Sequence, residues 1–160
     1  MTAVKGIVLG FIAGAIATLT VHELLSLLFN TYWTGWERVS WDMAPVTNPF
    51  LTEITVPKIV SAAFWGGLWG SLIGLILGPR PQGPTTLWGI LLGILGPALI
   101  GVFVAVPYLT ERFPPFFGGD MSKIIPVLVI LAGWGAATAW LYGFFRYCHL
   151  PGFGSNERAD

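Results

Sequence analysis

Charged side chains are scarce in this sequence. Only 10% of its 160 residues are Asp, Glu, Lys or Arg, against about 25% in an ordinary soluble domain. The eight basic residues balance the eight acidic ones, so neither a basic surface for nucleic acid nor an acidic tail for a cationic partner is indicated. So few charges cannot solvate a globule of this size, which argues against a soluble protein and favours one whose main partner is the lipid bilayer.

Cysteine and catalytic motifs are also missing or nearly so. Cys148 is the single cysteine, so an intrachain disulfide is excluded and a cysteine-based zinc site is not expected. Cys148 and His149 together supply too few ligands for a metal ion. No P-loop, G-x-S-x-G, H-E-x-x-H or C-x-x-C motif is present. We therefore assign no catalytic residues and no metal site, and an enzyme acting on a lipid or quinone is the least favoured function.

Apolar stretches, in contrast, are abundant. Four of them are long enough to cross a bilayer as helices, and they cover residues 4–29, 59–77, 85–109 and 124–147. The first stretch is too long for a signal-peptide core, so we expect it to stay as a spanning helix. The sequence thus predicts an all-α polytopic membrane protein, with the whole chain, 1–160, as one transmembrane domain.

The connections between these stretches differ in kind. Residues 78–84 form a short Gly/Pro turn, which predicts that the second and third helices are antiparallel neighbours. Segments 30–57 and 110–123 mix aromatic and charged side chains, as suits the headgroup zone, and we expect interfacial loops there with a short surface helix around Tyr32–Val39. Four spans put both termini on one side. Lys and Arg are equally divided between the two sides, and the acids of the long loops favour cytoplasmic termini.

Glycine recurs at every fourth position of the apolar stretches. Rows of this kind let two helices approach closely in lipid, and this predicts helix packing more strongly than a glycine-lined pore. The residues concerned are Gly6, Gly10 and Gly14 in the first stretch, Gly66, Gly70, Gly74 and Gly78 in the second, Gly89 and Gly93 in the third and Gly135 in the fourth.

The two halves of the chain resemble each other. Lys58 precedes Trp69-Gly70 by the same distance at which Lys123 precedes Trp134-Gly135, and Gly10 and Gly14 match Gly89 and Gly93. Tandem duplication of a helical hairpin would produce this pattern, although apolar sequence also generates such matches by chance.

His22 and Glu23 are the main candidates for a function beyond packing. They lie roughly 8 to 10 Å beyond the middle of the first helix, where ionisable side chains are costly and usually functional. His22 is a candidate ligand for a metal or tetrapyrrole, or half of a proton relay with Glu23, whereas a hydrogen-bonded interhelical pair is the simpler reading. Lys58 and Lys123 are the expected counter-charges of Glu23, and Pro97 is expected to kink the third helix.

One block resembles a known group of sequences. Met43–Val46, Pro57, Ser61 and the run Phe64-Trp65-Gly66-Gly67-Leu68-Trp69-Gly70 are similar to a group of small, uncharacterised bacterial inner-membrane proteins with four predicted spans. That group also has a His late in its first helix and a Gly-Trp-Gly in its last, but Gln usually follows the His where this chain has Glu23. The resemblance implies the four-span architecture, an intact first helix and a bacterial inner membrane or its invaginations, and implies no activity.

Two functions fit these observations. The first is a non-catalytic subunit that packs through its glycine faces against itself or within a larger complex, such as an electron-transfer or photosynthetic assembly. The second is a small transporter or channel that uses His22, Glu23 and the Pro97 kink.

Overall fold

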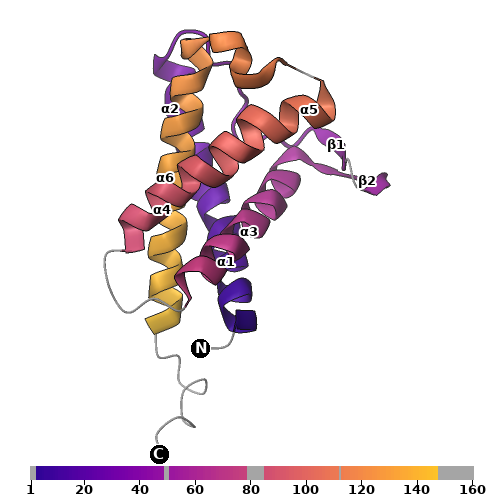
Figure 1. Ribbon diagram of the computed structural model, residues 1–160. Helices are drawn as coiled ribbons and strands as arrows, with labels where there is room; N and C mark the ends of the chain where they lie inside the picture. Colours follow the sequence, from indigo (N-terminus) through magenta and orange to yellow (C-terminus); the bar gives the residue numbers. More distant parts are fainter. Residues whose placement is uncertain (1–2, 49–50, 79–84, 112, 148–160) are drawn as a thin grey trace, which may run out of the picture.

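The protein is built from four helical spans, as the sequence predicts. The computed structural model describes residues 3–48, 51–78, 85–111 and 113–147 (Figure 1). Within this part of the chain, four helices are long and apolar enough to cross a membrane. They are Ala3–Tyr32 (α1 Ala3–Ala17, η1 Thr18–His22 and α2 Glu23–Tyr32), α3 Lys58–Leu77, Thr85–Thr110 (α4 Thr85–Gly93, η2 Ile94–Ala105 and α5 Val106–Thr110) and α6 Met121–Tyr147. The all-α polytopic fold is therefore confirmed.

The connections differ from the prediction more than the spans do. The surface helix expected around Tyr32–Val39 is wrong, because α2 ends at Tyr32 and the chain turns through Gly35 at φ +93°, a conformation that glycine adopts easily. The segment predicted as loop up to Pro57 contains an antiparallel hairpin of β1 (Pro45–Asn48) and β2 (Leu51–Pro57). A short 3₁₀ helix, η3 (Pro115–Gly119), precedes α6. The turn residues 79–84 and the Cys148-His149 pair lie outside the described residues.

The helices do not pack in the order expected from the short turn. α3 packs along α1, the third span packs along α6, and α1 and α6 meet each other at the centre. Both ends of the described chain lie at the same end of the molecule, and α3 and α4–α5 cross the other two spans obliquely (Figure 1). The second and third helices do meet, but only through a few contacts of α3 with α4 and through the Trp69 ring beside Gly96 and Gly101. α1 and α3 form the first helical hairpin, and the third span and α6 form the second. Within each hairpin the two helices pack through their glycine faces.

The glycine rows meet each other inside the chain. A methyl group on Gly70 would collide with the carbonyl oxygen of Gly10, and one on Gly74 would collide with that of Gly6. In the second hairpin, a methyl group on Gly135 would collide with the carbonyl oxygen of Gly89. Backbone therefore lies directly against backbone in both hairpins, as small-residue rows allow in lipid.

The two hairpins pack in the same register. Gly10 faces Gly70 and Gly74 of α3, and its counterpart Gly89 faces Gly135 and Ala139 of α6. Counted along the aligned helices, Ala139 is the position that corresponds to Gly74. This is the packing that a repeated hairpin requires, whereas the duplication itself stays a prediction.

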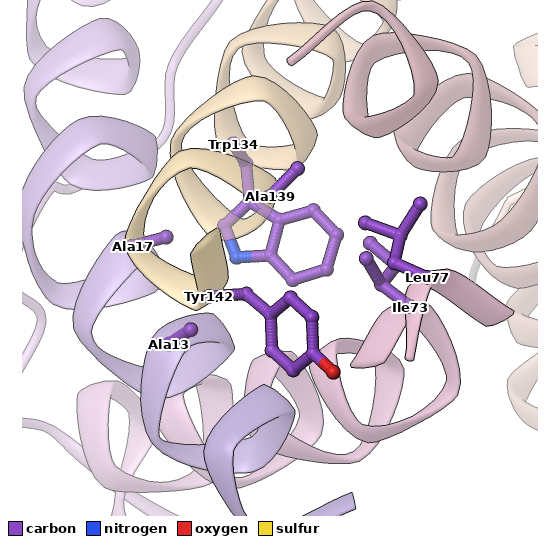
Figure 2. Close-up of a cluster of buried hydrophobic side chains, with 7 residues drawn as sticks. All are labelled: Ala13, Ala17, Ile73, Leu77, Trp134, Ala139 and Tyr142. Carbon is purple, nitrogen blue, oxygen red and sulfur yellow. The ribbon is translucent and has the colours of Figure 1, made fainter. Parts of the chain in front are cut away.

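Trp134 lies where the two hairpins join. Its ring is buried with Tyr142 of α6, between side chains of α1 and α3 (Figure 2). The indole N–H of Trp134 donates to the Thr18 hydroxyl at 2.9 Å and approaches the Gly14 carbonyl oxygen at 3.1 Å. A hydrogen bond in the apolar interior thus connects α6 to the first span.

Candidate functional site

Glu23 is a fully buried carboxylate with three partners. Its Oε1 accepts from Arg38 Nη2 at 2.8 Å and from His22 Nδ1 at 2.9 Å. Its Oε2 accepts from the backbone N–H of Trp41 at 2.7 Å. A buried charge is tolerated when it is paired and its lone pairs are hydrogen-bonded, and Glu23 meets both conditions.

The predicted counter-charges of Glu23 are wrong. Lys58 Nζ lies 2.7 Å from Asp42, and Lys123 Nζ lies 3.6 Å from Asp120, so both lysines pair within the loops at their own helix starts. Arg38 takes the place predicted for them. It reaches Glu23 because residues 33–42, called the strap below, fold back over the end of the first span.

Three tryptophans hold the strap in place. Trp33 donates its indole N–H to the Ser122 carbonyl oxygen at 2.9 Å, Trp36 donates to the Ser26 hydroxyl at 3.3 Å, and Trp41 donates to the Leu19 carbonyl oxygen at 3.0 Å. An indole combines an apolar ring with one donor, and it suits the border between lipid and water. The strap is rich in tryptophan, and this could have indicated from the sequence that it docks against the helix ends and brings Arg38 near the first span.

The His22 ring lies between Glu23 and Arg38. Nδ1 lies 2.9 Å from Glu23 Oε1, and because a carboxylate accepts, Nδ1 carries the proton of this bond. Arg38 Nη1 lies 3.1 Å from Nε2 and 3.4 Å from Nδ1, so it lies against the face of the ring. A metal or tetrapyrrole bound through Nδ1 would have to break the bond to Glu23. In the described ranges, no group of three or more His, Cys, Asp or Glu side chains is placed to hold a metal ion.

A cavity of about 540 Å³ adjoins this cluster. Its walls are α3 on one side and η2 with α5 on the other, and because α3 makes few contacts with the third span, the cavity lies open between them. Trp134 and Leu131 of α6 contribute to its lining, and Thr18, His22, Arg38 and Thr110 contribute polar groups. We call this cavity the pocket. Its other lining residues are Ala62, Trp65, Gly66, Trp69, Pro97, Gly101, Val102, Ala105, Val106 and Leu109.

Equivalent positions of the two halves face the pocket. Trp69 and Trp134 correspond in the aligned repeat, as do His22 and Gly101, and all four line the cavity. The pocket therefore lies at the interface between the two hairpins. His22 supplies a polar group on one side, and the absence of a side chain at Gly101 leaves space on the other.

The backbone changes its winding at the pocket in both halves. Thr18–His22 and Ile94–Ala105 are π-helical, and each segment contributes lining residues. Pro97 lies near the start of the second segment, and the helix continues through it as one span from Thr85 to Thr110. A π-helical turn accommodates proline's missing N–H by changing the hydrogen-bond pattern, and such turns occur frequently at functional sites.

Comparisons of the chain with models of protein families, with curated proteins and with solved structures found no match. The resemblance to small bacterial inner-membrane proteins therefore stays a prediction, and the functional argument rests on the pocket and on the cluster of His22, Glu23 and Arg38 beside it.

Proposed function

We propose that the protein is a small membrane carrier that takes an amphipathic molecule from the lipid into the pocket between its two hairpins. The observation that carries this proposal is the pocket itself, apolar along its walls and polar at the end where His22 and Arg38 lie. Ligand sites of this size are mostly apolar, with a few convergent polar groups that orient the ligand. Secondary transporters commonly bind their substrates at the interface of structural repeats.

The geometry supports a carrier better than an accessory subunit. The glycine rows were the argument for contacts with other proteins, but Gly10, Gly14, Gly70, Gly89 and Gly135 all face another helix of the same chain. The subunit hypothesis, with its electron-transfer or photosynthetic host, stays a prediction without the contact surface on which it depended. His22 and Pro97, which the transporter hypothesis invoked, both line the pocket.

The proposed location is the bacterial inner membrane, with both termini in the cytoplasm. The four spans support a multi-pass membrane protein. The bacterial origin is supported by the sequence resemblance, and the orientation by the acidic residues of the two long connections. On this orientation the strap and the pocket's polar end face the periplasm.

A photoreactive lipid probe tests the proposal. The purified protein is reconstituted in nanodiscs with a probe that carries a diazirine in an 18-carbon chain, and crosslinked peptides are identified by mass spectrometry. We expect crosslinks on the pocket faces of α3 and η2 as well as on the lipid-facing surface. Movement of a fluorescent chain analogue between leaflets of vesicles is measured in parallel.

Two substitutions in neighbouring positions separate the pocket from the lipid surface. Gly101→Leu fills the pocket next to Trp69, where a methyl group would already lie 3.5 Å from the ring. Ile100→Phe adds bulk at a side chain that is 59% exposed on the described surface. Gly101→Leu should remove the pocket crosslinks and the movement, and Ile100→Phe should keep both. Equal crosslinking in the native protein and Gly101→Leu would contradict the proposal.

A further inference from the structure

We infer that the molecule carried in the pocket has an anionic head group, a carboxylate or a phosphate, and that Arg38 binds it. This inference rests on the proposed function and names the chemical class of its ligand. It depends on the distribution of charge around Arg38 and on the hydrogen bonds that this side chain makes.

The pocket is electrostatically one-sided. Among the described residues that line it, Arg38 is the single charged one, and no acidic side chain is present. The remaining polar groups are the His22 ring, the hydroxyls of Thr18 and Thr110 and the tryptophan N–H groups. In a space with apolar walls, one cation attracts an anion far more strongly than in water.

Arg38 has donors to spare. Its Nη2 donates to Glu23 and its Nη1 lies 3.1 Å from His22 Nε2, while a guanidinium has five N–H groups in a planar fork that suits carboxylate and phosphate oxygens. The Arg38 side chain is 38% exposed, whereas that of Glu23 is 1% exposed. Glu23 therefore holds the guanidinium from its buried side, while more than a third of the Arg38 side chain stays exposed.

Glu23 also weakens the attraction. Its negative charge lies 2.8 Å from Arg38 Nη2 and partly neutralises the guanidinium. A bound anion would share Arg38 with this internal carboxylate. Removing the charge of Glu23 should therefore strengthen anion binding, an effect in the opposite direction from damage to the fold.

The surrounding charges favour entry from the lipid. Arg38 is the common wall of the pocket and of two smaller hollows at the loop end, of about 320 and 460 Å³. Glu37 lines both hollows, and the lysines that reach them, Lys58 and Lys123, are paired with aspartates. With Arg38 included, the charged residues that line the 320 Å³ hollow leave one net negative charge, and those that line the 460 Å³ hollow balance. An anion that enters sideways between α3 and η2 meets Arg38 alone.

Three probes with the same brominated chain test the inference. They end in a carboxylate, a phosphate monoester or an alcohol, and their binding to the protein in nanodiscs is followed by quenching of tryptophan fluorescence, since Trp65, Trp69 and Trp134 line the pocket. The pH is kept high enough to ionise the carboxylate probe. The ionised probes should bind roughly tenfold or more tightly than the alcohol, because hydrogen bonds to charged groups are the stronger ones. The tighter of the two anions identifies the head group.

Variants at the cluster assign the preference to Arg38. Glu23→Gln should raise the affinity for the anionic probes severalfold and leave the alcohol unchanged. The double variant Glu23→Gln/Arg38→Gln removes both charges together, so no buried charge is left unpaired, and it should bind all three probes as the native protein binds the alcohol. Lys123→Gln removes a cation on the same side that does not line the pocket, and it should behave as the native protein does.

The outcomes separate this inference from the proposed function. If the alcohol binds as tightly as both anions, the head-group inference is wrong and the carrier proposal stands. If none of the three probes binds, the carrier proposal itself fails. An unchanged anion preference in the double variant would show that a group other than Arg38 selects the head.

Discussion

The stability of the first hairpin should depend on the absence of a single methyl group at Gly70. In Gly70→Ala, the new carbon would collide with the Gly10 carbonyl oxygen and lie 2.8 Å from Gly14 Cα, where ordinary contact begins at 3.4 Å. The obstructing atoms are backbone, so no side-chain rotation can relieve the contact and α1 must move away from α3. Overpacking of this kind costs about 1–3 kcal/mol. We expect a loss of about 2 kcal/mol in the free energy of unfolding, roughly a thirtyfold change in the folded-to-unfolded ratio.

The measurement is reversible unfolding in mixed micelles, followed by circular dichroism as the denaturing detergent is increased. Gly143→Ala is the matched control, because a methyl group there would meet the Thr85 hydroxyl at an ordinary 3.6 Å. Gly135→Ala should lose about as much as Gly70→Ala, since it occupies the corresponding position of the second hairpin. Native stability in Gly70→Ala, or an equal loss in Gly143→Ala, would refute the packing argument.

Two further predictions concern the connection between the hairpins and the loop charges. Trp134→Phe removes the donor to Thr18 while keeping an aromatic ring, and should lower stability by about 1 kcal/mol in the same unfolding assay, with far-ultraviolet spectra unchanged. The hydrogen bond from Lys58, together with a backbone N–H, holds the pKa of Asp42 below its ordinary value. The ionised Asp42 therefore stabilises the native state at pH values above the ordinary carboxyl pKa. This stabilisation is lost as the pH falls through the lowered pKa of Asp42. Lys58→Gln should raise the pKa of Asp42 in a carboxyl NMR titration, and an unchanged value would contradict the pairing.

Sequence reasoning identified the elements of this fold more reliably than their partners. Length and apolar character are properties of one segment, so the four spans could be predicted within a few residues at each end. Which glycine rows meet cannot be read from one segment, because every row presents the same surface. The short turn after Gly78 suggested contact between the second and third helices, and the closer fit of backbone to backbone within each hairpin decides otherwise.

The same limit applies to the site. The depth of His22 and Glu23 in the first span made them candidates for a function, and that function stays a prediction. Their charge partner was sought at helix starts because lysines there lie at the same level, but Arg38 reaches Glu23 through tertiary hydrogen bonds of the strap. The pocket was beyond sequence reasoning altogether, since it forms where α3 and the third span make few contacts with each other.

The direct backbone contact in each hairpin has a mechanical consequence. Long side chains between two helices can change rotamer and let the helices shift. Where glycine backbones touch directly there is no such side chain, so each hairpin should move as one stiff body. Relative motion should then be easiest at the contact between the first span and α6, where Trp134 donates its hydrogen bond to Thr18. Rotation of one hairpin against the other at this contact would widen or narrow the gap between α3 and η2 without disturbing the packing inside either hairpin. Glycine, the most flexible residue in an isolated chain, would here concentrate the motion of the protein in one place.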